Sequence, residues 1–246
     1  MNKQKKGFTL VELLVVIGIL GILMGALFPA ISAAMLSANT NACAMRGRNL
    51  FVAITQANTE REAAGLPSVW PKSTEQKSED QEDISSEIFS DSAKYFESLF
   101  DIANYGKEGW QPYVSVDIGV LSGAGVTPFS GGSTLNGKNV TWVVLQGVAD
   151  ELEDVIPVMV TRNAASRDLV TSGSFQGTEV KPVGIGKAGG GESDTPFGNK
   201  AFVLVRKGGA TNVIKARYNK QYLVYNRQGF TLPTGTTFAY LLTGAN

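Results

Sequence analysis

The sequence predicts an α+β fold in which one long N-terminal helix packs on an antiparallel β-sheet. Residues 13–31 are nineteen consecutive positions without a charged or strongly polar side chain, as expected for a helix able to cross a membrane. Short β-rich segments begin after residue 140, and no helical segments of roughly 10–15 residues separate them. Strands connected in this way pair antiparallel.

The first helix is expected over residues 8–64. Its apolar part, from Phe8 to Phe28, has 21 residues. At ~1.5 Å per residue this part is ~31 Å long, which matches the hydrocarbon core of a bilayer. A secretory signal peptide is the alternative interpretation, but its apolar core would be shorter, at about 7–15 residues.

The charges around this segment predict its orientation. Basic residues precede the apolar run, and none follows before Arg46; they are Lys3, Lys5 and Lys6. By the positive-inside rule, the N-terminus stays in the cytoplasm and the chain after about Ser37 is exported.

The helix is expected to continue beyond the membrane, because apolar residues recur on one face, at Leu36, Cys43, Leu50, Ile54 and Ala57. Cys43 lies on this face, where a small packed hydrophobic side chain is its expected role. Gly65 followed by Pro67 predicts the end of the helix.

Composition excludes several kinds of catalytic site. The chain has no histidine and one cysteine, so it has no Ser-His-Asp triad, no His-based metal site and no intrachain disulfide. Lys plus Arg and Asp plus Glu are both 22, a balance that gives no reason to expect nucleic-acid binding. Composition leaves either an enzyme that uses only carboxylate, Lys, Ser or Tyr side chains, or a protein whose role is not catalysis. No motif in the sequence points to the first, so we expect no enzyme activity, no catalytic residue, no metal and no cofactor.

Glu12 is the exception inside the apolar run. A carboxylate in a bilayer is costly unless it is paired, so an intramembrane acid is a candidate functional residue. The simpler interpretation is that Glu12 lies at the cytoplasmic interface and is hydrated.

The segment Lys5-Lys6-Gly7-Phe8-Thr9-Leu10-Val11-Glu12, followed directly by the apolar run, resembles the N-terminus of type IV prepilins. This family includes type IV pilins and the pseudopilins of type II secretion. The resemblance covers residues 1–36 and implies cleavage between Gly7 and Phe8 by a prepilin peptidase, followed by N-methylation of Phe8.

The resemblance also implies that Glu12 neutralises the new amino terminus of a neighbouring subunit during assembly. Physical chemistry supports this role, because a cationic amine in hydrocarbon is best paired with an opposite charge. The family's filaments can lose helicity between a glycine and a proline, and Gly21 and Pro29 lie at the corresponding positions. Gly21 and Gly25 also match a helix-dimer motif, although glycine is commonly tolerated in membrane helices.

We expect four segments: a basic leader over 1–7, a transmembrane and assembly helix over 8–36, its amphipathic continuation over 37–66, and an exported head over 67–246. In the head, residues 72–87 hold six acids and two lysines and are expected to form a solvated loop. A second helix is expected over 86–103. The expected strands are 140–145, 155–161, 202–206, 213–217 and 222–225.

Local motifs refine this picture. Gly208-Gly209 suits a two-residue hairpin turn, and Pro157 places its strand at an edge or a bulge. Residues 184–189 match G-x-G-x-x-G, but turn-forming residues follow instead of a helix, so a dinucleotide site is rejected.

The function expected from the resemblance is that of a pseudopilin-like structural subunit of a type II secretion filament. A type IV pilin for adhesion, motility or DNA uptake is one alternative, and an exported enzyme or binding protein on a single-pass anchor is another. The expected partners are other pilin or pseudopilin subunits, the prepilin peptidase, an inner-membrane assembly platform and the lipid bilayer. The expected location is the inner membrane, and then the filament.

Overall fold

The computed structural model describes residues 9–71, 92–123, 125–132, 134–136, 139–148, 153–164, 174–175, 196–198, 200–215, 230–231 and 237–239. The chain divides into two compact units, Met1–Asn39 and Thr40–Asn246. The predicted segments 72–87, 184–189 and 222–225 lie outside the described residues.

Helix α1 (Leu10–Ala63) has 54 residues and confirms the long helix expected from the sequence. Pro29 lies inside it, and the helix continues on both sides. The helix ends in a Schellman motif, in which the Leu66 N–H donates to Arg61 O at 2.8 Å and the Gly65 N–H donates to Glu62 O at 2.9 Å. Gly65 has a φ of 72°, a left-handed conformation that favours glycine.

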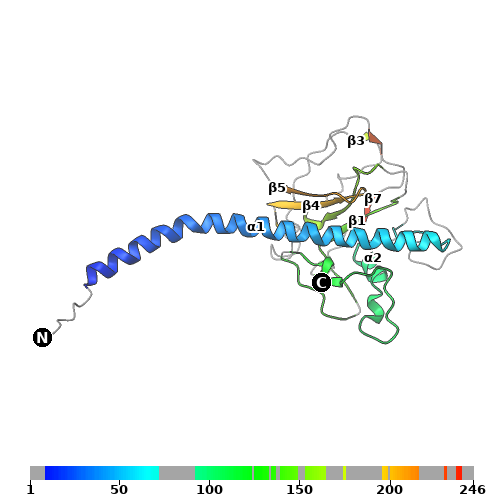
Figure 1. Ribbon diagram of the computed structural model, residues 1–246, viewed down its shortest axis with the longest axis horizontal. Coiled ribbons are helices and arrows are strands. Elements are labelled where there is room, and N and C mark those ends of the chain that lie inside the picture. Colours follow the sequence, from blue (N-terminus) through cyan, green and yellow to red (C-terminus); the bar gives the residue numbers. More distant parts are fainter. Residues whose placement is uncertain are drawn as a thin grey trace. The chain divides into compact units, whose positions relative to one another are not determined.

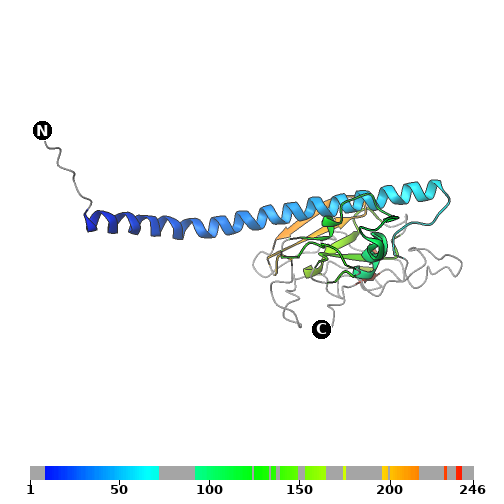
Figure 2. The ribbon, with the colours of Figure 1, turned by 90° about the horizontal axis from the view of Figure 1, so that it is seen from below.

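Within the second unit, α1 runs along one face of the sheet (Figure 2). The side chains that it buries there are mostly small: Thr40, Cys43, Ala44, Gly47, Leu50, Ala53, Ile54 and Ala57. Gly47 is the closest point, since an added Cβ would lie 2.5 Å from Cη2 of Trp142 and 2.8 Å from Cγ2 of Val205. A stripe of small residues therefore lets the helix backbone approach the sheet.

The main sheet has the strand order β5-β4-β2-β1-β7, and every described pairing is antiparallel (Figure 1). Its strands are β1 (Trp142–Gln146), β2 (Pro157–Thr161), β4 (Ala201–Arg206), β5 (Thr211–Lys215) and β7 (Thr237–Ala239). A separate antiparallel pair joins β3 (Ser174–Phe175) to β6 (Phe230–Thr231). The α+β class expected from the sequence is confirmed.

Four of the five predicted strands are right in place and imprecise at the ends, and the fifth, 222–225, stays a prediction. Pro157 lies at a bulge, because the β2–β4 register shifts between Pro157 and Met159; β2 itself is a central strand and not an edge. The β4–β5 hairpin is confirmed, but the predicted two-residue turn is wrong. Strand β4 ends at Arg206 and β5 begins at Thr211, so four residues, 207–210, join them, and the Arg206 N–H donates to Ala210 O at 2.8 Å across this loop.

The second helix ends earlier than predicted. Helix α2 (Ser92–Leu99) ends before residue 103, and residues 86–91 lie outside the described part. The α-helix stops because Asp101 adopts a left-handed conformation with a φ of 47°. Short 3₁₀ turns follow, η2 (Ile102–Asn104) and η3 (Ile118–Leu121), and η4 (Arg162–Ala164) comes after β2.

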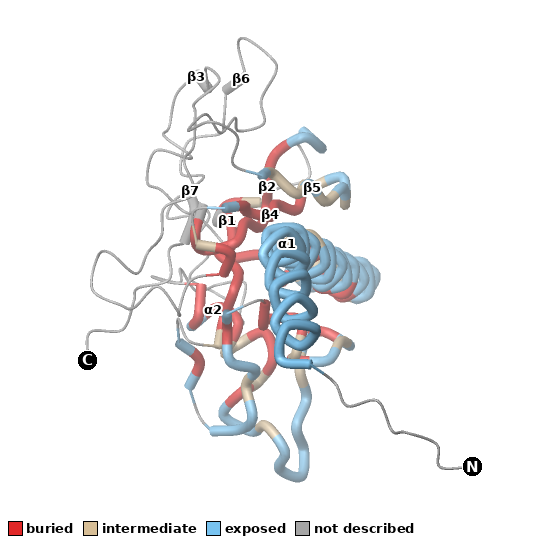
Figure 3. Tube along the Cα trace, turned by 90° about the vertical axis from the view of Figure 1, so that its left-hand side faces the viewer, coloured by how far each residue is buried: buried red, intermediate tan, exposed pale blue. Residues whose placement is uncertain are grey.

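Buried residues are concentrated in the strands of the second unit (Figure 3). Trp142 is fully buried, and its indole N–H donates to Val120 O at 2.9 Å. Helix α2 is joined to β1 by the Val144 N–H, which donates to Ser92 Oγ at 3.0 Å. Cys43 is buried as predicted, and burial raises the pKa of its thiol to about 12.

Candidate functional site

Thr9 and Glu12 close the first turn of α1 in a capping box. The Thr9 backbone N–H donates to Glu12 Oε2 at 2.9 Å, and the Glu12 N–H donates to Thr9 Oγ1 at 3.3 Å. The Thr9 hydroxyl also donates to the same Glu12 Oε2, at 2.8 Å. Together these bonds satisfy two backbone donors that a helix N-terminus otherwise leaves without a partner.

The capping box fixes the Glu12 carboxylate at the start of the helix. Negative charge is favourable there, because the N-terminal end of a helix carries a partial positive charge. Both bonds from Thr9 end on Oε2, and Oε1 makes no hydrogen bond with any residue that the structure describes. One carboxylate oxygen is therefore available to a further donor.

The helix that follows Glu12 exposes large apolar side chains on every face. Within the first unit, α1 buries none of its residues. By its length and apolar composition, α1 is able to cross a membrane. The exposed side chains include Leu14, Ile17, Ile22, Met24 and Phe28.

The small residues of this segment have room around them. An added Cβ at Gly18, Gly21 or Gly25 would meet no atom within 4 Å. No contact with the residues that the structure describes therefore requires these glycines, in contrast to Gly47. The predicted flexibility between Gly21 and Pro29 stays a prediction, since the segment is helical here.

Gly7 and Phe8, the predicted cleavage and methylation residues, lie outside the described part of the chain. Among the described residues, no group of three or more Cys, Asp or Glu side chains is placed to hold a metal ion.

A family model described as the prokaryotic N-terminal methylation motif matches residues 2–28. Comparisons with curated proteins and with solved structures found no match. This motif, together with the apolar helix, makes the N-terminal part of the chain similar to that of type IV pilin and type II pseudopilin prepilins. A motif of this kind implies processing by a prepilin peptidase and assembly with pilin subunits, and with the apolar helix it indicates anchoring at the inner membrane before assembly.

Sequence reasoning identified Glu12 but missed its partner Thr9. The signal was present, because Thr9-x-x-Glu12 before an apolar run is the sequence pattern of a capping box. The position of Glu12 inside an apolar run indicates a role for its charge, but Glu12 also satisfies the backbone N–H of Thr9.

Proposed function

We propose that the chain is a pseudopilin-like structural subunit of a type II secretion filament, assembled through its N-terminal helix. In this proposal residues 1–7 are the leader, 8–36 the membrane and assembly helix, 37–66 its continuation, and 67–246 the exported head. The subunit is cut between Gly7 and Phe8, is methylated at Phe8 and then joins the filament. No catalytic step is assigned to it.

The single observation that carries this proposal is the geometry at Glu12. Cleavage creates a cationic α-amine at Phe8, and in an apolar surrounding this amine needs an anionic partner. The capping box holds the Glu12 carboxylate at the start of the helix and leaves Oε1 without a partner among the described residues. The carboxylate can thus keep its bonds to Thr9 and still accept from the amine of a neighbouring subunit.

The apolar helix supports the same role. Side chains such as Leu14 and Ile22, which are 66% and 75% exposed, require lipid before assembly and other helices after it. A bilayer and a bundle of identical helices both provide such a surrounding. In this proposal the assembly platform of the inner membrane transfers the helix from one to the other.

A type IV pilin for adhesion, motility or DNA uptake is the second candidate, because the methylation motif is shared by both groups. An exported binding protein or enzyme on a single-pass anchor is the third. We favour a structural subunit, since chains with this motif are typically structural and assemble with pilin subunits.

Processing is tested by mass spectrometry of the protein isolated from cells with an active prepilin peptidase. We expect a mature chain that begins with N-methylated Phe8. A chain that keeps Met1 through Gly7 in such cells would contradict the assignment.

The secretion role is tested by deleting the gene and measuring two outputs in the same strain. We expect proteins destined for the medium to accumulate in the periplasm, with surface pili unchanged. Loss of pili with normal secretion would instead favour the type IV pilin.

A further inference from the structure

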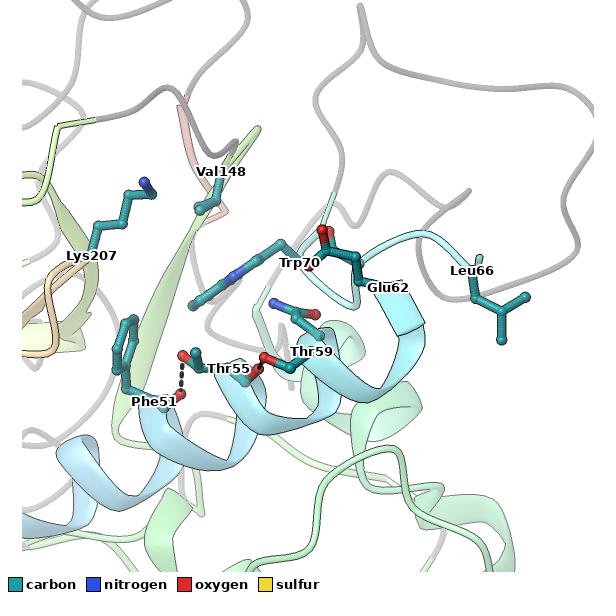
Figure 4. A pocket seen from close by; sticks show the side chains of 10 residues that line it. Phe51, Thr55, Thr59, Glu62, Leu66, Trp70, Val148 and Lys207 are labelled. Carbon is teal, nitrogen blue, oxygen red and sulfur yellow. Dashed lines mark hydrogen bonds between the residues drawn. The ribbon is translucent and has the colours of Figure 1, made fainter. Parts of the chain in front are cut away.

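A groove lies within the second unit, between α1, the chain that follows it, and the β4–β5 loop (Figure 4). Its volume is about 340 Å³. This is at the lower end of the ~300–1,000 Å³ of small-molecule sites, so the groove suits a small ligand or one end of a larger one. The groove is separate from the assembly helix, and its role does not depend on the proposed function.

Trp70 lines the groove and differs from the other tryptophans of the chain. Trp110 and Trp142 donate their indole N–H groups to the carbonyl oxygens of Phe100 and Val120, at 2.8 and 2.9 Å. Trp70 is only 8% exposed, yet its indole N–H makes no hydrogen bond with any residue that the structure describes. The indole nitrogen is not among the fully buried polar atoms that lack a partner, so its N–H is accessible at the groove and can donate to an acceptor on a ligand there.

The α1 wall of the groove offers mainly hydrogen-bond acceptors. The Thr55 hydroxyl donates to Phe51 O at 2.9 Å, and the Thr59 hydroxyl donates to Thr55 O at 3.0 Å. Each hydroxyl has used its one hydrogen and keeps a lone pair for a ligand. Asn58 is the exception, because its Oδ1 accepts from the Val69 N–H at 2.7 Å and its amide N–H groups donate to none of the residues that the structure describes.

The remaining lining combines apolar rings with one charge of each sign. The Phe51 and Trp70 rings lie 6.2 Å apart between centroids, at an angle of 43°. Lys207 and Glu62 lie on opposite sides of Trp70 (Figure 4). A strongly charged ligand of either sign would meet one attractive and one repulsive group, so the lining favours a neutral ligand.

We propose that this groove binds a neutral polyhydroxylated ligand, a mono- or disaccharide unit of a glycan. A sugar hydroxyl both donates and accepts, so one ligand can serve the indole N–H of Trp70, the amide of Asn58 and the lone pairs of Thr55 and Thr59. The C–H face of a sugar ring is apolar and packs on aromatic rings such as Phe51. An extended peptide is less suitable, because the α1 wall offers side chains and no backbone groups for it to pair with.

The test uses the full processed chain in phospholipid nanodiscs, so that no sugar-based detergent competes. The probes are maltose, cellobiose, lactose and diacetylchitobiose, with trialanine as the peptide probe, and binding is followed by tryptophan fluorescence and saturation-transfer NMR. We expect a saturable response to at least one disaccharide and none to trialanine.

Two substitutions test the groove itself. Trp70→Phe removes the indole N–H, and Thr55→Val removes a hydroxyl from an exposed helix position. Each should weaken sugar binding roughly 3–10-fold, the effect of losing one hydrogen bond. Trp110→Phe is the matched control, because it removes an indole N–H outside the groove and should leave sugar affinity unchanged.

Three results would overturn the proposal: no saturable response to any disaccharide, unchanged affinity in both groove variants, or saturation by trialanine instead. Thermal unfolding of each variant checks that the fold is kept. If Trp70→Phe does not fold, Thr55→Val decides alone, since the Thr55 hydroxyl bonds only within its own helix.

Discussion

The first half of α1 has the larger apolar content and buries none of its residues, whereas the second half has fewer apolar residues and buries one face. From Leu10 to Met35 every residue of the helix is exposed, including the large aliphatic side chains. From Thr40 to Ala57 the helix buries one face, and five of the eight buried residues are Ala, Gly or Cys. The exposed half is the one with the larger apolar side chains.

The two halves of α1 also differ in how their apolar residues are distributed around the helix. The first half is apolar on all faces, so it presents no one side to a partner, as is typical of a helix surrounded by lipid or by other helices. The second half alternates small buried residues with polar ones, and the sheet covers the small residues. A helix with exposed apolar side chains needs a partner that covers them. The distribution of these side chains around the helix determines whether the sheet of the same chain can be that partner.

Replacing Glu12 should have the largest effect. Glu12→Ala removes the charge partner and one side of the capping box, so we expect processing to continue and filament assembly to be lost. Cross-linking and electron microscopy of filaments measure the result. Glu60→Ala, a carboxylate change on the exposed face of the second half, is the control and should assemble normally.

Normal filaments from Glu12→Ala would contradict the pairing argument. Equal loss in both variants would mean that assembly depends on total charge and not on the position of Glu12.

The contrast between Gly47 and Gly25 tests the packing difference. At Gly47 an added Cβ would lie 2.5 Å from the buried Trp142 ring, whereas at Gly25 nothing lies within 4 Å. Gly47→Ala should lower the free energy of unfolding of the second unit by about 1–3 kcal/mol, the usual cost of overpacking. Gly25→Ala should leave it unchanged, as measured by near-UV circular dichroism during denaturation.

If Gly47→Ala unfolds at the same denaturant concentration as Gly25→Ala, the close helix–sheet contact does not limit stability.

The Cys43 thiol predicts a dependence of stability on alkaline pH. Burial raises its pKa from 9.0 to about 12, so the folded state keeps the proton that the unfolded state loses. The contribution is fully present below pH 9 and declines as the pH rises toward about 12. The slope is at most about 1.4 kcal/mol per pH unit.

The measurement compares wild type with Cys43→Ala, because other groups titrate in the same range. The stability difference between them should change in favour of Cys43→Ala above pH 9. A difference that stays constant across this range would mean that the thiol is accessible to solvent in the folded state.

The smallest effect is expected on the exposed face of the second half. Gln56 donates to Glu60 Oε1 at 3.0 Å, a pair separated by four residues on one helix. Gln56→Ala should change the free energy of unfolding by less than about 0.5 kcal/mol, because such exposed pairs contribute little. A loss above 1 kcal/mol, roughly twice the upper value for such pairs, would indicate that this face has a partner within the chain.

Sequence patterns predicted the elements better than their ends. The length of α1, the burial of Cys43 and the antiparallel sheet follow from periodicity, which depends on many residues at once. The end of α2 depends on one residue, Asp101, whose left-handed conformation no pattern indicates. The four-residue β4–β5 loop likewise depends on packing, because an added Cβ at Gly208 would lie 3.0 Å from Asp154.

The functional residues likewise divide into those that the sequence pattern predicts and those that depend on tertiary packing. Glu12 was predictable because a charge is rare in an apolar run. The groove was not, because its lining comes from segments far apart in the sequence, such as Thr55, Trp70 and Lys207. Only the pairing of strands brings the β4–β5 loop beside the C-terminal part of α1.

The point at which the buried face of α1 begins has a practical consequence for protein production. Thr40 is the first buried residue of the helix, and Asn39 before it is a residue type that caps helices well. A fragment that starts at Asn39 keeps every described core residue. It omits the exposed aliphatic side chains between Leu10 and Met35. Such a fragment, sent to the periplasm by a cleavable signal, is the natural starting material for crystals and for solution NMR.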